Sequence, residues 1–146
     1  MKANTTRFGE IDVDNTRILN FIQPIIGYND YSKYTLLEHN GNDMFYWLQS
    51  LEDPELAFPV SIPSRFDIDY SFEIDDATVE KLEIKDVSDI LIYNIVAIPV
   101  NEPKKATINL LGPVIINAKN NKALQYIISN SDYTSRYPLF DKEQQK

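Results

Sequence analysis

Residues 90–98 read ILIYNIVAI. Both of its alternating faces are apolar apart from Asn94, and β-branched and aromatic side chains dominate it. A strand whose two faces are both covered lies in the interior of a β structure. The stretch therefore predicts a central strand.

Shorter strand candidates flank this one along the chain, at residues 8–13, 17–21, 34–38, 44–49, 56–62, 108–116 and 123–128. The last two are expected to pair across Asn120 and Asn121, because asparagine tolerates the left-handed backbone of a tight turn. Asp75 or Asp76 as N-cap predicts one short helix over residues 77–82. These patterns predict an all-β, mainly antiparallel barrel or sandwich, and we favour a small β-barrel-like fold. We expect one domain over residues 1–146, with a less apolar C-terminal tail over residues 129–146.

The charge of the chain is concentrated in its middle. The 146 residues include 14 Lys and Arg and 22 Asp and Glu, for a net charge of −8. Residues 52–89 alone hold 12 acids and 3 bases, a net charge of −9. This balance argues against direct binding of nucleic acid or of an anionic membrane, both of which require a basic patch. The acidic stretch is either a docking face for a basic partner or a solvated surface that keeps a small domain soluble.

Missing residue types exclude several chemistries. The chain has no cysteine and one histidine, His39, which excludes disulfides, thiolate chemistry and two-histidine metal sites within one chain. Its longest uncharged run, residues 106–118, has 13 residues, whereas a membrane-spanning helix needs about 20. No apolar leader follows the N-terminus. We therefore expect a soluble, cytoplasmic protein.

The clearest alternation of apolar and polar residues runs over residues 66–75, and it predicts a strand over residues 70–74. Its polar face carries Asp67, Asp69, Glu73 and Asp75. Carboxylates with this spacing could bind a hard cation or act as an acid/base pair in a small enzyme. They could also form an acidic docking face, or simply the solvated side of a strand.

A cluster of interface-type residues lies near the C-terminus. Residues 133–140 contain three aromatic side chains, a leucine and an arginine, which are types enriched in binding hot spots. The segment either docks on its own barrel or anchors a partner, and the sequence leaves both open.

Four segments of the chain resemble the flagellar assembly factor FliW family of bacteria. They are TRFGEI at 6–11, FYWLQS at 45–50 running into DPELAF at 53–58, NLLGPVIIN at 109–117 and DYTSRYPL at 132–139. They follow the order of the family and cover nearly the whole chain. Two positions depart from the family pattern: Ile26-Gly27-Tyr28 replaces its usual proline-glycine-phenylalanine, and Tyr137 replaces a usual histidine.

The resemblance implies a non-enzymatic protein with a small β-barrel-like fold and with no catalytic residue, metal or cofactor. Members of the family bind the RNA-binding translational regulator CsrA and stop it from repressing flagellin translation. They also bind flagellin itself, which releases CsrA. The family's C-terminal segment is implicated in holding the regulator, and here it corresponds to Asp132, Tyr133, Arg136, Tyr137, Pro138, Leu139 and Phe140.

An RNA-binding regulator has a basic surface, so we add the hypothesis that Asp67, Asp69, Glu73 and Asp75 form an RNA-excluding face beside it. Two other classes of function stay open from the residues alone. One is a small-molecule-binding β-barrel, which would need a sizeable apolar cavity. The other is the carboxylate-dependent enzyme.

Overall fold

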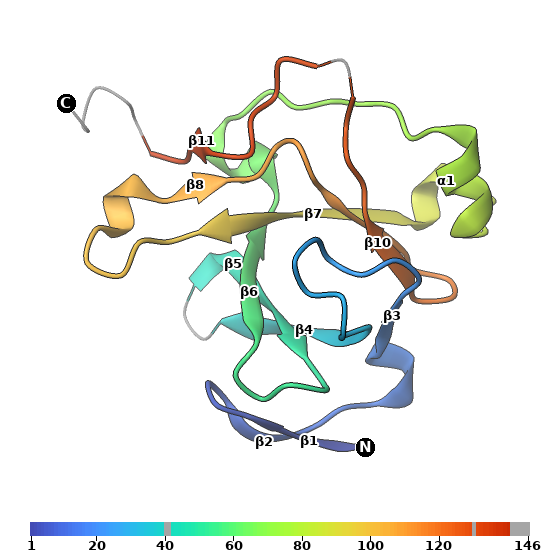
Figure 1. Ribbon diagram of the computed structural model, residues 1–146, viewed down its shortest axis with the longest axis vertical. Coiled ribbons are helices and arrows are strands. Elements are labelled where there is room, and N and C mark those ends of the chain that lie inside the picture. Colours follow the sequence, from blue (N-terminus) through green and yellow to red (C-terminus); the bar gives the residue numbers. More distant parts are fainter. Residues whose placement is uncertain (40–41, 130, 141–146) are drawn as a thin grey trace.

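The computed structural model describes residues 1–39, 42–129 and 131–140. Strand β7 (Ile90–Ala97) lies in the middle of the molecule (Figure 1). It pairs antiparallel with β6 (Ala57–Ser61), β8 (Thr107–Ile108) and β9 (Val114–Asn117). Tyr93 and Ile95 of β7 face one apolar cluster, whereas Ile92 and Val96 face others on the opposite side. The prediction of a central strand covered on both faces is confirmed.

Seven strands close into a mixed barrel. The order around it is β3 (Leu19–Phe21), β4 (Lys33–His39), β5 (Asn42–Ser50), β6, β7, β9 and β10 (Lys122–Gln125). Closure comes from β10, which pairs antiparallel with β9 and parallel with β3. Asn121, with a φ of 61°, makes the expected left-handed turn between β9 and β10. The predicted barrel-like, mainly antiparallel fold is confirmed.

Side chains fill the barrel. Its interior cluster includes Leu19, Phe21, Tyr34, Leu48, Val60, Val114, Ile116 and Ala123. Tyr34 is completely buried and its ring contacts Phe21 edge-on at 4.9 Å. This interior is a packed core, which is the usual content of a barrel with so few strands.

The remaining elements lie outside the barrel. A hairpin of β1 (Lys2–Thr5) and β2 (Gly9–Asp12) stands at the N-terminal end, and β11 (Tyr137–Pro138) adds to the free edge of β8. The one α-helix of the described residues, α1 (Asp76–Lys81), has Asp75 as N-cap, as expected. Four short 3-10 helices complete this part of the chain: η1 (Asn15–Arg17), η2 (Pro63–Phe66), η3 (Val87–Asp89) and η4 (Pro103–Lys105).

The predicted strand over residues 70–74 is wrong. Residues 67–75, which we call the acidic strap, belong to no ladder and run over the outside of the barrel from η2 to α1 (Figure 1, light green). The alternation of burial is nevertheless present. Phe66, Ile68, Tyr70, Phe72 and Ile74 are half-buried, while Asp67, Asp69, Ser71, Glu73 and Asp75 are exposed. The pattern correctly predicted which side chains face the protein, but it carries no information on whether the backbone has a neighbour.

Candidate functional site

Two tyrosine hydroxyls hold the backbone of the strap in place of a neighbouring strand. Tyr133 Oη accepts a hydrogen bond from Ser71 N at 3.0 Å and donates to Ser71 O at 2.9 Å. Tyr126 Oη accepts from Asp75 N at 3.2 Å and donates to Glu73 O at 3.3 Å. Local sequence patterns could not reveal these contacts, because the partners are 51 to 62 residues apart.

Tyr70 fixes the centre of the strap to the barrel. Its hydroxyl donates to Leu110 O at 2.6 Å and accepts from Asn94 Nδ2 at 3.3 Å, and Asn94 Nδ2 also donates to Asn109 O at 2.8 Å. Asn94 interrupts the apolar pattern of β7 because its side chain lies beneath the strap and forms hydrogen bonds with Tyr70 and Asn109 there. Burial raises the pKa of Tyr70 to about 12.

Alkaline pH is expected to destabilise the protein between pH 10 and 12. Burial raises the pKa of Tyr70 and of Tyr34 to about 12 from an ordinary value of 10.0. The folded state therefore holds both phenolic protons more tightly than the unfolded chain does. This stabilisation is complete below pH 10 and is lost as the pH rises to about 12.

Urea unfolding at a series of alkaline pH values measures this loss. Tyr70→Phe should lower stability at neutral pH by about 1–2 kcal/mol, since it leaves Leu110 O without its donor. It should also make the alkaline decline shallower. Tyr28→Phe, at an exposed tyrosine, is the matched control. If stability of the Tyr70→Phe variant declined with alkaline pH as steeply as that of the parent, the assignment of this loss to deprotonation of Tyr70 would be wrong.

The acidic side chains of the strap point into solvent. The ion pairs within the described residues involve Asp12, Glu10, Glu102 and Glu83, and none involves Asp67, Asp69, Glu73 or Asp75. Asp67 begins the strap with a left-handed backbone at the end of η2. Asp75 ends it as N-cap of α1, and hydrogen bonds from Thr78 hold the pKa of its carboxyl below the ordinary value. Within the described residues, no group of three or more His, Cys, Asp or Glu side chains is placed to hold a metal ion.

Residues 131–140, which we call the tail, pack against the barrel of the same chain. Tyr137 and Pro138 pair with Ile108 and Thr107 of β8, and Leu139 is only 7% exposed in the cluster formed by Val96, Ala106, Ile108 and Leu110. Tyr133 packs on Tyr70 with the ring centroids 4.8 Å apart. The sequence left open whether this segment packs on the barrel of its own chain or anchors a partner, and the structure shows that it packs on the barrel. Residue 130 and residues 141–146 of the predicted C-terminal extension lie outside the described part.

The tail still offers side chains to a partner. Asp132, Arg136 and Phe140 are exposed, Phe140 to 40%, while Tyr133, Tyr137 and Pro138 are half-buried. Because Tyr133 also binds the backbone of the strap, the tail and the strap form one continuous face. The structure thus brings the two sets of predicted site residues together, although they are far apart in the sequence.

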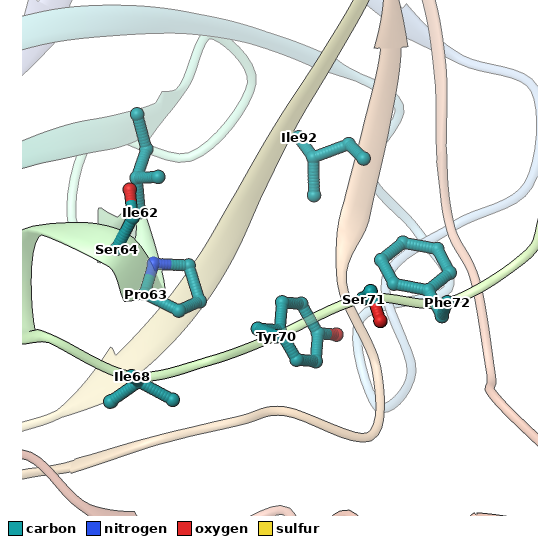
Figure 2. Close-up of a pocket in the computed structure, with 8 residues that line it drawn as sticks. All are labelled: Ile62, Pro63, Ser64, Ile68, Tyr70, Ser71, Phe72 and Ile92. Carbon is teal, nitrogen blue, oxygen red and sulfur yellow. The ribbon is translucent and has the colours of Figure 1, made fainter.

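A groove runs along the strap. It has a volume of about 280 Å³, and Figure 2 shows its lining side chains. They are Ile68, Tyr70, Ser71 and Phe72 of the strap, Ile62, Pro63 and Ser64 at the start of η2, and Ile92 of β7. The groove is apolar inside, whereas Asp67 and Asp69 beside it are exposed to solvent.

Comparison with known proteins decides the family. The model of the family described as FliW protein matches residues 2–139. The chain belongs to the FliW family. The flagellar assembly factor FliW of Thermoanaerobacter pseudethanolicus is 39% identical over 143 residues, which are 97% of this chain and 95% of that protein. The FliW of Pseudothermotoga lettingae is 42% identical over 137 residues, which are 94% of this chain and 87% of the relative.

A crystal structure of a flagellar assembly factor FliW shares the whole fold. Its TM-score is 0.89 at 29% identity, and the match covers 98% of this chain and 99% of the other. The resemblance predicted from four sequence segments is confirmed. FliW is a non-enzymatic assembly factor, which agrees with the expectation that this chain is not an enzyme. No helix in the described part of the chain is long and apolar enough to span a membrane.

Proposed function

We propose that this chain acts in the cytoplasm as a flagellar assembly factor that binds a CsrA-type translational regulator and flagellin. Binding of the regulator relieves the repression of flagellin translation. Binding of free flagellin releases the regulator, which represses translation again, so that translation falls as unsecreted flagellin accumulates. Membership of the FliW family supports the role in assembly.

The observation that carries the regulator proposal is the acidic strap beside the tail, whose carboxylates make no ion pair in the part of the chain that the structure describes. A protein that binds RNA neutralises phosphates with lysine and arginine, so its surface is basic. Asp67, Asp69 and Glu73 are exposed and make no ion pair within the described residues, which leaves their charges available to such a surface. Arg136 and Phe140 of the tail supply the types of side chain that anchor interfaces.

The same carboxylates give a mechanism for exclusion of RNA. Once the tail holds the regulator, the acidic strap repels the phosphates of an RNA that approaches the basic groove. At physiological ionic strength this repulsion extends only about 8 Å. The strap must therefore lie at the border of the RNA-binding surface.

Titration calorimetry with the purified regulator, with purified flagellin and with both in sequence tests the proposal. We expect saturable binding of each partner to the chain. We also expect flagellin, added to the preformed complex, to release the regulator. No heat with either protein would overturn the proposal, and binding of both at once would overturn the release step.

A further inference from the structure

The two tyrosine hydroxyls occupy only one edge of the strap. In an extended chain the N–H and C=O of successive residues point to opposite edges. Ser71, Glu73 and Asp75 are the residues whose backbone groups bind Tyr133 and Tyr126. The backbone groups of Tyr70, Phe72 and Ile74 therefore point to the other edge.

That second edge is unpaired within the part of the chain that the structure describes. The backbone N–H and C=O groups of Tyr70, Phe72 and Ile74 make no hydrogen bond there. The preceding residue on this edge, Ile68, donates to Pro63 O at 3.3 Å, which closes one end of it. An open row of donors and acceptors on an extended segment is a template for pairing with another chain.

The groove lies along this open edge. Tyr70, Ser71 and Phe72 form one wall of the groove, and Ile62, Ser64 and Ile92 stand opposite (Figure 2). Tyr126 and Tyr133, which bind the other edge, are not among its lining residues. The groove thus offers apolar contacts to side chains of whatever pairs with the open backbone.

We propose that the open edge of the strap receives an extended segment of the CsrA-type regulator as an added β-strand. This inference rests on the proposed function. Main-chain hydrogen bonds to Tyr70, Phe72 and Ile74 add to the affinity that the tail supplies, and the groove accepts alternate side chains of the segment.

Charge and distance favour the regulator as the occupant. The outward side chains of Asp69 and Glu73 flank the edge without a cationic partner in the described residues, and opposite charges on adjacent strands attract. Paired strands lie about 4.8 Å apart. Strand addition therefore places the added segment of the regulator well within the range of about 8 Å over which the carboxylates act.

Amide hydrogen exchange followed by NMR tests the pairing. In the ¹⁵N-labelled free chain the amides of Tyr70, Phe72 and Ile74 should exchange rapidly. With saturating regulator we expect their exchange to slow at least about tenfold, as formed ladder hydrogen bonds require. Calorimetric binding with unchanged exchange at all three amides would overturn the inference but leave the proposed function standing. Absence of binding would overturn both.

A substitution in the groove gives a second test. Ser64→Tyr places a ring in the groove from an exposed position of η2 and is expected to weaken regulator binding at least about tenfold. Ser88→Tyr is the matched control, because Ser88 is an exposed serine of another 3-10 helix, η3, and does not line the groove. Equal affinity of the two variants would contradict docking at this groove.

Discussion

Deleting residues 131–146 is expected to weaken binding of the CsrA-type regulator at least about a hundredfold, which corresponds to the loss of one or two strong anchor residues. The deletion removes the exposed Arg136 and Phe140. It also removes Tyr133, whose hydroxyl holds both backbone groups of Ser71. Titration calorimetry measures the loss, and unchanged affinity would contradict a role of the tail in binding.

The structure adds a complication to this deletion. Leu139 is 7% exposed in an apolar cluster, so removing it costs about 2–4 kcal/mol of folding free energy. Thermal unfolding must therefore accompany calorimetry. Arg136→Glu keeps the cluster intact and should still weaken binding at least about tenfold. The matched control is Arg17→Glu, at an exposed arginine of η1 that lies outside the strap and the tail. Equal binding by both arginine variants would exclude Arg136 as an anchor.

Reversing three charges of the strap is expected to separate binding of the regulator from exclusion of RNA. In the variant Asp67→Lys, Asp69→Lys and Glu73→Lys, we expect regulator affinity to fall by less than about tenfold, because exposed ion pairs contribute little and the tail contacts and main-chain hydrogen bonds persist. RNA displacement, measured at low salt with enough of each variant to saturate the regulator, should become at least about tenfold less effective. A pair of charges about 4 Å apart contributes about 1 kcal/mol even in water, and three signs are inverted.

The dependence of RNA displacement on salt concentration tests whether this effect is electrostatic. Screening shortens the reach of the carboxylates, so the difference between parent and variant should shrink as ionic strength rises. A control with the same charge change, Asp30→Lys, Glu55→Lys and Glu80→Lys, uses exposed acids outside the strap. If RNA displacement by the strap variant equals that of the parent at every salt concentration, the RNA-excluding face is wrong.

Local patterns in the sequence predicted the central strand and the helix. They predicted less of how the other elements are arranged around these two. Both faces of β7 are apolar because one meets the barrel interior and the other meets the strap and tail. Asp75 as N-cap was visible because capping acts over three residues. Closure through the parallel pairing of β10 with β3 joins only Lys122 with Asn20 and Ala123 with Phe21. Because this contact involves only two residue pairs from distant segments, no local sequence pattern predicts it.

The strap shows where reasoning from periodicity stops. Alternation over residues 66–75 reports burial, and burial does alternate there. A ladder also needs a neighbouring backbone, and here the hydroxyls of Tyr126 and Tyr133 take that place. The acids of the strap and the residues of the tail were both candidates in the sequence, but only the fold joins them into one face.

Release of RNA from the regulator by this chain can be measured directly. A fluorescently labelled leader RNA of the flagellin transcript is bound to the CsrA-type regulator and titrated with this chain, and fluorescence anisotropy is followed. We expect anisotropy to fall to the value of free RNA once the chain saturates the regulator. Anisotropy that stays at the value of the complex, or rises as a ternary complex forms, would contradict it.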